Sequence, residues 1–246
     1  MSKIDLRLGD CLEVMKTIED NSIDAIITDP PYGTTICKWD SVIDFELMWE
    51  QLNRIIKPNG AIVLFGSEPF SSLLRCSNIK NFKYDWIWQK QKPSNFMNAN
   101  KQPMKYHEII SVFYKKQPTY NKQMIPRDEG GKSRIKYKQN RTNSAHRKTL
   151  LEKKDVKYDS DLKNPSSVLK INTTYQNTIK HPTQKPLELM ENLIKTYTNE
   201  NETVLDFTMG SGTTLVACKN LNRKGIGIEQ DDKYFKIAQE RVDSFA

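Results

Sequence analysis

Four consecutive residues, Asp29-Pro30-Pro31-Tyr32, combine groups that could carry out chemistry on a nucleobase. The exocyclic amine of adenine or cytosine is a poor nucleophile, because its lone pair is delocalised into the ring. Acceptors on both N–H groups would favour the pyramidal, reactive shape; Asp29 offers a carboxylate, and Pro30 a carbonyl fixed by the rigid Pro-Pro dipeptide. Tyr32 offers a flat ring on which an extruded base could stack. The segment therefore predicts catalytic roles for Asp29, Pro30 and Tyr32. The alternative is a purely structural role, as an extended proline turn with a capping Asp.

A second segment, residues 204–214, has the pattern of a nucleoside-cofactor site. Strand residues lead into Gly210 and Gly212, which allow close approach of the backbone to a ligand, and then into a helix whose first N–H groups favour an anion. Glu229 ends the next strand, 19 residues beyond Gly210, where a carboxylate suits the two hydroxyls of an adenosine ribose. The pattern leaves NAD, FAD and S-adenosylmethionine open. Leu215 stands where a third glycine would fall, and this leans away from a dinucleotide.

Alternating strand and helix patterns surround these two segments and predict a mostly parallel sheet with helices on both faces. Ligands of such sheets bind outside the carboxyl ends of the strands, where the loops after Thr28 and Phe207 both lie. Strands are expected at Ile4–Leu8, Ile23–Thr28, Ala61–Phe65, Tyr84–Trp88, Glu108–Tyr114, Thr203–Phe207 and Gly225–Glu229. Helices are expected at Asp10–Ile18, Phe45–Ile56, from after Pro69 to about Arg75, Leu187–Tyr197, Thr213–Asn220 and Asp231–Val242.

Positive charge is concentrated in one stretch. The chain has 38 Lys and Arg against 30 Asp and Glu, and residues 115–170 alone hold 16 and 6 of these, an excess of 10. The remaining residues hold 22 basic and 24 acidic side chains, so the whole excess lies in this stretch. Charge of this density attracts polyanions such as nucleic acid. A solvated surface insert without a partner is the alternative.

Composition excludes several classes of protein. With 37% hydrophobic and 28% charged residues, the chain is too apolar for a disordered protein and too polar for a membrane protein. The longest apolar run is five residues, Ala61–Phe65, and no secretory signal is recognisable. The four cysteines are scattered without metal-ligand spacing, so we expect free thiols in a reducing, cytoplasmic compartment and no metal site.

With both segments in view, the chain resembles the β group of amino-directed DNA methyltransferases. Residues 29–32 match the catalytic tetrapeptide of that family, and residues 206–212 match its F-x-G-x-G cofactor loop. Residues 8–11 look like the segment that contacts the adenine amine of the cofactor, and residues 181–186 look like the motif around its methionine end. The order is that of the β group: catalytic loop, recognition insert, cofactor loop.

The resemblance implies a fold and a division of the chain. The fold would be a doubly wound, seven-stranded, mostly parallel sheet with one antiparallel edge strand. Residues 1–114 would form the catalytic part, 115–178 a basic target-recognition insert, and 179–246 the cofactor-binding part of the same domain. The implied cofactor-binding residues are Asp10, Cys11, Asp29, His181, Lys185, Asp206, Phe207, Gly210, Gly212, Thr213 and Glu229.

The implied activity is methyl transfer from S-adenosylmethionine to adenine N6 in double-stranded DNA, by base flipping and direct in-line transfer. Cytosine N4 is the alternative, and Asp29 favours adenine because cytosine-N4 members usually carry serine there. An RNA or protein amino-methyltransferase and a non-catalytic DNA-binding module are more distant alternatives. The resemblance favours a homodimer, leaves room for a cognate restriction endonuclease, and gives no role to a membrane.

Contacts with DNA are the least specific part of the sequence reading. We expect Lys136, Lys138 and Arg141 of the basic insert to contact phosphates. Trp86, Trp88 and Phe96 could face DNA or lie in the core, and the nearby Asn95, Asn98 and Asn100 could be contacts or plain loop residues. The pair His107-Glu108 resembles a family motif near the target base, but polar residues at the end of a strand explain it equally well.

Overall fold

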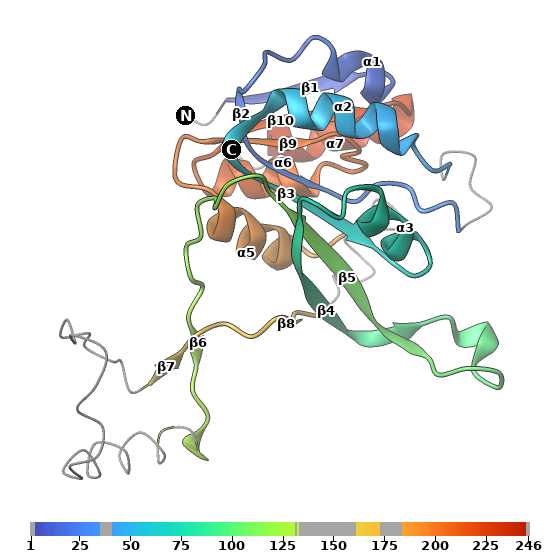
Figure 1. Ribbon diagram of the computed structural model, residues 1–246, viewed down its shortest axis with the longest axis vertical. Helices are drawn as coiled ribbons and strands as arrows, with labels where there is room; N and C mark the ends of the chain where they lie inside the picture. Colours follow the sequence, from blue (N-terminus) through green and yellow to red (C-terminus); the bar gives the residue numbers. More distant parts are fainter. Residues whose placement is uncertain (1–2, 35–40, 131, 133–160, 173–183, 245–246) are drawn as a thin grey trace. The chain divides into compact units, whose positions relative to one another are not determined.

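A large sheet organises the protein in this computed structural model, which describes residues 3–34, 41–130, 132, 161–172 and 184–244. Within the described residues the sheet has eight strands (Figure 1). In spatial order they are β1 (Ile4–Leu8), β10 (Lys224–Glu229), β9 (Thr203–Asp206), β2 (Ile23–Thr28), β3 (Ile56–Gly66), β5 (Lys105–Phe113), β4 (Phe82–Ser94) and β8 (Val168–Lys170).

The expected doubly wound, mostly parallel sheet is confirmed, with two differences. The described residues form eight strands rather than the expected seven, because the short strand β8 pairs with β4, and the antiparallel strand lies elsewhere than expected. All neighbouring pairs are parallel except β3–β5 and β5–β4, so β5 alone runs against the others. It is not an edge strand, because β4 and β8 continue the sheet beyond it. The reason is the hairpin from β4 to β5: hairpin partners must be adjacent and antiparallel, and β5 returns into the place between β3 and β4.

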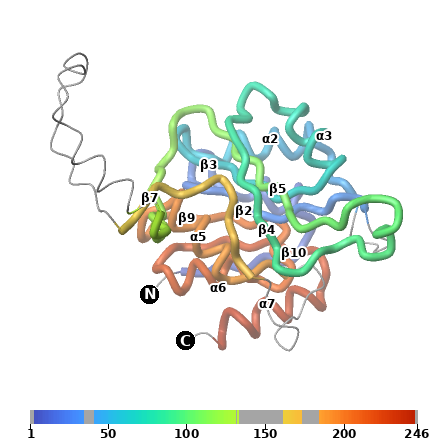
Figure 2. Tube along the Cα trace, turned by 90° about the horizontal axis from the view of Figure 1, so that it is seen from below, coloured from blue at the N-terminus to red at the C-terminus, as the bar shows by residue number. Residues whose placement is uncertain are grey.

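Helices cover both faces of the sheet (Figure 2). One face carries α1 (Cys11–Met15), α2 (Phe45–Ile55) and α3 (Phe70–Ser77), and the other carries α5 (Leu187–Tyr197), α6 (Thr213–Asn220) and α7 (Asp232–Ser244). The period of two in β3 explains the two cores: Ala61, Val63 and Phe65 pack with α5 and α6, whereas Ile62 and Leu64 pack with the helices of the opposite face.

The two segments with chemical potential meet at the centre of the sheet. β2 and β9 are neighbours, with Ala25 opposite Val204 and Ile26 opposite Leu205. The chain leaves β2 toward α2 on one face and leaves β9 toward α6 on the other. This divergence opens a crevice at the carboxyl edge of the sheet, which is where α/β proteins bind ligands.

Element boundaries differ from the sequence expectation mainly in the strands. β3 begins at Ile56, directly after α2, because residues 57–60 form an irregularity between the pairs Ile23–Ile56 and Ala25–Ala61. β4 and β5 are longer than expected and continue beyond the sheet as a hairpin arm, which we define as residues 89–107 (Figure 1). Its tip carries a short 3-10 helix, Phe96–Asn98. Within the described ranges, no helix has the length and apolar character needed to cross a membrane.

Two compact units divide the chain: residues 1–121 with 167–246, and Lys122–Ser166. The second unit lies inside the range 115–178 expected for the basic insert, and the functional division of the chain stays a prediction. Its described part pairs β6 (Ile125–Pro126) with β7 (Leu162–Lys163) in antiparallel fashion. An ion pair of 3.2 Å between Lys163 and Asp128 links the same two segments.

Candidate active site

A cavity of about 250 Å³ lies at the carboxyl edge of the sheet, over β2, β9 and β10. The loop after β2 contributes residues 29–32, the glycine turn after β9 contributes residues 206–211, and Glu229 closes the end of β10. Gly9, Asp10 and Cys11 line it from the loop after β1. Loops from four parallel strands thus bring the catalytic and the cofactor segments of the sequence to one cavity.

Asp29 is held by two side-chain donors. The Tyr32 hydroxyl donates to Oδ1 and the Lys185 ammonium donates to Oδ2. The Tyr32 ring packs against Phe70, with centroids 5.0 Å apart, and the Lys185 nitrogen lies 5.1 Å from the centre of the Phe65 ring. Both contacts fix the donors themselves, so the Asp29 carboxylate has a defined orientation.

Asp29 is one of four largely buried charged side chains, in which carboxylates and ammonium groups alternate. Lys185 also lies 3.4 Å from Glu108 Oε2, and Lys90 lies 3.1 Å from Glu108 Oε1. Burial raises the pKa of Asp29, although Lys185 opposes the change. Burial alone would lower the pKa of Lys185, but the carboxylates of Asp29 and Glu108 raise it above its ordinary value. Burial acts to raise the pKa of Glu108, and the two lysines outweigh it and lower that pKa.

Asp206, at the end of β9, is a second buried carboxylate. The hydroxyls of Thr28 and Thr214 donate to its two oxygens, and the Thr208 amide donates to Oδ1 over 3.2 Å. Thr208 also bridges to the catalytic loop, because its hydroxyl donates to the Asp29 carbonyl over 3.1 Å. Burial raises the pKa of Asp206 to about 6 despite these three donors.

This shifted group should make stability depend on pH. The pKa of Asp206 rises from an ordinary value of 3.8 to about 6 on folding, so the folded state binds the proton more tightly. The stabilisation is complete below the unfolded value and is lost as the pH rises through the folded one. As the pH rises from 4 to 7, the free energy of unfolding of Asp206→Asn should therefore increase by about 2–3 kcal/mol relative to that of wild type. Urea unfolding at both pH values measures this change, with the exposed Asp243→Asn as control. A difference that does not vary with pH would contradict the assignment.

The glycine turn is shaped by backbone conformation and by Glu229. Gly210 and Gly212 have φ angles of +52° and +74°, which side-chain-bearing residues rarely adopt. A Cβ on Gly212 would also lie 2.9 Å from the Ala238 Cβ of α7. Glu229 accepts the Gly210 amide at Oε2 and the Asp231 amide at Oε1, each over 2.9 Å. Burial raises the pKa of Glu229.

Side chains from α7 and from the segment before α5 form hydrogen bonds with the same glycine turn and with the start of α6. Arg241 donates to the carbonyl and hydroxyl of Ser211 and to the Thr213 hydroxyl, the last over 3.1 Å. The Ser211 hydroxyl donates to Gln184 Oε1 over 3.1 Å. Residue Cys11 faces the cavity as a neutral thiol, since burial raises its pKa to about 12.

The structure gathers most of the residues named from sequence. Gly212 caps α6 and does not line the cavity. His181, Lys136, Lys138 and Arg141 lie outside the described residues. The residues predicted from the sequence that do line the cavity, through side chain or backbone, are Asp10, Cys11, Asp29, Pro30, Tyr32, Lys185, Asp206, Phe207, Gly210, Thr213 and Glu229.

Sequence reasoning missed several residues of the site. The threonines around Asp206 and the Gln184–Ser211 contact were not foreseen, although Thr208 and Thr214 flank the glycine turn. The alternatives for the tryptophans resolve toward the core: Trp86 and Trp88 are 5% and 3% exposed, and their indole N–H groups bind the Tyr197 hydroxyl and the Ile171 carbonyl. Among the residues that the structure describes, no group of three or more His, Cys, Asp or Glu could hold a metal ion.

The fold and the cavity define a class of protein: an α/β protein with a cavity at the switch point of its mostly parallel sheet, the place where such proteins bind ligands. The N6/N4 methylase family model, described as DNA methylase, matches residues 23–240. The Type II methyltransferase M.HpaI of Haemophilus parainfluenzae is 32% identical over 96% of this chain and 73% of that protein.

Two solved structures are also similar to this chain. The crystal structure of an M1.HpyAVI–SAM complex matches with a TM-score of 0.65 and 29% identity, over 98% of this chain and 99% of that chain. The cytosine-N4-specific PvuII DNA methyltransferase matches with a TM-score of 0.69 and 17% identity, over 100% and 92%, and shows the fold alone. The chain belongs to the N6/N4 DNA methylase family, and it is a DNA methyltransferase of that type.

Proposed function

We propose that the protein transfers a methyl group from S-adenosylmethionine to the N6 amine of adenine in double-stranded DNA, with the target base flipped out of the helix. The observation that carries the proposal is the buried Asp29 carboxylate, held by Tyr32 and Lys185 in the same cavity as the glycine turn and Glu229. The membership in the methylase family gives the reaction class. Asp29 supports adenine over cytosine through the resemblance, in which cytosine-N4 members usually carry serine at this position.

The cavity fits the cofactor by the chemistry of its groups. Glu229 presents a carboxylate suited to the ribose hydroxyls, Asp10 offers an acceptor for the adenine amine, and Phe207 and Ile228 give apolar walls. Lys185 and Thr213, the first residue of α6, also line the cavity, and an ammonium group and helix N-terminal N–H groups suit a carboxylate. When bound, S-adenosylmethionine would supply a methyl group from its sulfonium: the bond to sulfur would break with the electron pair going to sulfur, a bond to the amine nitrogen would form, and the proton of that nitrogen would leave to water.

The residues of the chain prepare the amine for this step. The Asp29 carboxylate and the Pro30 carbonyl accept its two N–H groups, which removes the lone pair from conjugation with the ring. Charge that develops on nitrogen then meets fixed acceptors rather than mobile water. Tyr32 orients Asp29 through its hydroxyl and offers its ring to the base.

The test is nucleoside analysis after transfer of a labelled methyl group. Purified protein, labelled S-adenosylmethionine and unmethylated genomic DNA should yield labelled N6-methyladenine. Labelled N4-methylcytosine would establish the cytosine alternative instead. The cytosine-N4-specific PvuII enzyme shares the fold, so the fold alone does not choose between the two bases. Absence of label with intact DNA binding would leave the non-catalytic binding module.

The hairpin arm supports an interaction with DNA. Its residues, 89–107, include four lysines and no acidic side chain. At the tip, Phe96 is 74% exposed and Met97 is 92% exposed. Lys92 and Lys101 are exposed, whereas Lys90 pairs with Glu108. Exposed apolar side chains near these two exposed lysines fit a nucleic acid, where the lysines pair with phosphates and the apolar groups contact bases or sugars.

The basic insert should supply much of the remaining affinity for DNA. Replacing Lys136, Lys138 and Arg141 together with alanine should weaken binding and reduce the slope of log affinity against log salt by about 0.9 for each lost phosphate contact. Fluorescence anisotropy over a salt series measures the slope. The control is the exposed triple Lys16, Lys224 and Lys236 to alanine, which removes equal charge. Equal slopes for wild type and the insert variant would remove the insert from the DNA interface.

Partners and place of action follow from the same activity. Relatives such as M.HpaI are Type II methyltransferases, and a cognate restriction endonuclease and a homodimer are part of the proposal. A DNA-modifying enzyme acts where cellular DNA is, so cytoplasm and nucleoid are the proposed location. Light scattering of the purified protein tests the dimer.

A further inference from the structure

The buried ion pairs around Asp29 continue away from the cavity. Lys185 lies between two carboxylates, those of Asp29 and Glu108, and Lys90 lies on the far side of Glu108. The side chains of Lys185, Lys90, Glu108 and Asp29 are only 9%, 10%, 17% and 20% exposed. Charges this sheltered interact strongly and are poorly screened by salt.

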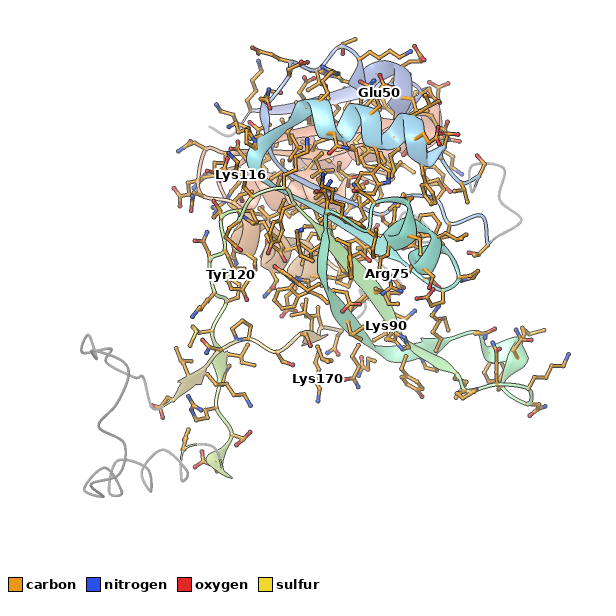
Figure 3. All side chains as sticks on the ribbon, in the orientation of Figure 1. Glu50, Arg75, Lys90, Lys116, Tyr120 and Lys170 are labelled. Atoms are coloured by element: carbon orange, nitrogen blue, oxygen red, sulfur yellow. The ribbon has the colours of Figure 1, made fainter. Side chains whose placement is uncertain are left out.

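The topology explains why Glu108 reaches this place. β5 alone runs against the other strands, so its first residues lie at the carboxyl edge where β2 and β3 end. Ile109 pairs with Gly66 at the end of β3, and Glu108 is the next residue outward. Across the hairpin Glu108 pairs with Trp88, which places Lys90 beside it where β4 leaves the sheet (Figure 3).

The four side chains balance in charge. Two carboxylates and two ammonium groups sum to zero when Asp29 is ionised, which is the form that accepts the N–H of a target amine. Loss of either inner partner leaves an uncompensated buried charge, and the remaining groups must respond by changing their proton affinity.

We propose that Glu108 is a positioning residue for the reaction: it shares the Lys185 ammonium with Asp29 and so fixes both the place and the ionisation of the Asp29 carboxylate. This inference rests on the proposed function only for its kinetic readout. With Glu108 present, Lys185 is divided between two carboxylates, so it orients the Asp29 carboxylate and leaves lone pairs on that carboxylate available to the target amine. Without Glu108, the ammonium belongs to Asp29 alone and competes with the amine.

The direction of each effect follows from the charges. Glu108 acts to raise the pKa of Asp29 and Lys185 acts to lower it. Removal of the Glu108 charge should therefore move the ionisation of Asp29 to lower pH, and removal of the Lys185 charge should move it to higher pH. If Glu108 and Lys185 only supported the fold, removing their charges would not shift the ionisation of Asp29 in opposite directions.

Other ionisable groups face this set and must be held constant. From the loop after β2, Tyr32 donates to Asp29; from the end of β9, Asp206 interacts with Asp29. From β5, Lys105 interacts with Glu108, and Glu68 interacts with Lys105. All four remain in each variant, so the shifts report on Glu108 and Lys185.

The experiment compares Glu108→Gln and Lys185→Met with wild type in single-turnover methyl transfer over a pH series, at saturating S-adenosylmethionine and DNA. The acidic limb should move down by about one pH unit in the first variant and up by a similar amount in the second. Glu108→Asp keeps the charge and should restore the limb toward its wild-type position. Glu50→Gln on α2, an exposed carboxylate distant from Lys90 in Figure 3, removes the same charge and should shift nothing.

A second readout does not depend on activity. In protein without cofactor or DNA, carbon NMR of labelled aspartate carboxyls gives the titration midpoint of Asp29, whose signal is identified by its loss in Asp29→Asn. The midpoint should be lower in Glu108→Gln than in wild type. An unchanged midpoint, or an equal shift in Glu50→Gln, would overturn the inference. If wild type transferred no methyl group, the proposed function would fail while the titration still decided the role of Glu108.

Discussion

Asp29→Ala is expected to lower the rate of methyl transfer by at least roughly 10²–10³, the usual loss when one preorganised electrostatic group is deleted. The reason is geometric: Asp29 has a fixed orientation, because Tyr32 and Lys185 hold its two oxygens, and only a fixed acceptor can keep the amine pyramidal. Binding of DNA should be largely retained, since the arm and the insert lie elsewhere in the chain. Single-turnover transfer at saturating cofactor and DNA measures the effect.

The structure adds a control for this experiment. Alanine at position 29 leaves the buried Lys185 ammonium with Glu108 as its remaining carboxylate partner, and such unpairing can destabilise a protein by about 3–5 kcal/mol. Asp29→Asn keeps a carbonyl acceptor and the side-chain volume, so it should lose less activity than alanine. Thermal melting and cofactor binding of both variants separate folding from chemistry. Near wild-type turnover of folded Asp29→Ala would refute the proposed mechanism.

Tyr32 shows what the structure changed in the expectation. The sequence assigns a role to its ring alone, and phenylalanine would keep that ring. The structure places its hydroxyl on Asp29, so phenylalanine removes one of the two donors that orient the carboxylate. Tyr32→Phe is now expected to slow transfer, and by less than Asp29→Ala, because Lys185 still holds the other oxygen.

Local patterns were enough for the sheet and for the cavity. The strand Ile23–Thr28 and the helices Leu187–Tyr197 and Thr213–Asn220 occur with the expected bounds, because each has a clear period and a clear stop signal. Parallel strands bring their carboxyl ends to one edge, so the loops after β2 and β9 were expected at the same edge; the pairing of β2 with β9 makes them neighbours.

Contacts between distant segments could not be predicted in the same way. Lys185 and Asp29 are 156 residues apart; the resemblance assigns both to the cofactor site, but nothing in the sequence indicates the ion pair between their side chains. Glu108 was ambiguous, since a glutamate near a strand end is ordinary until the antiparallel direction of β5 places it beside Lys185. The long arm was also missed, because its lysines, asparagines and prolines interrupt the alternation that marks a strand.

Glu229→Ala should weaken binding of S-adenosylmethionine by at least about 100-fold, because two hydrogen bonds to a carboxylate are each worth about 1.5–3 kcal/mol. The structure gives Glu229 a second task, as its oxygens already accept the amides of Gly210 and Asp231. Calorimetric titration would therefore report a loosened glycine turn as well as a lost ribose contact.

A modified ligand separates these two effects. S-adenosylhomocysteine and its analogue without ribose hydroxyls should bind wild type with very different affinities, since only the first can donate to Glu229. The Glu229→Ala protein should hardly distinguish them, whereas a variant that only loosened the turn would weaken both equally and keep the difference. Glu240→Ala, an exposed change on α7, serves as the control and should discriminate as wild type does. If Glu229→Ala kept the full preference for the ribose hydroxyls, the carboxylate at the end of β10 would not be their partner, and the hydroxyls would have to be bound by another group of the cavity.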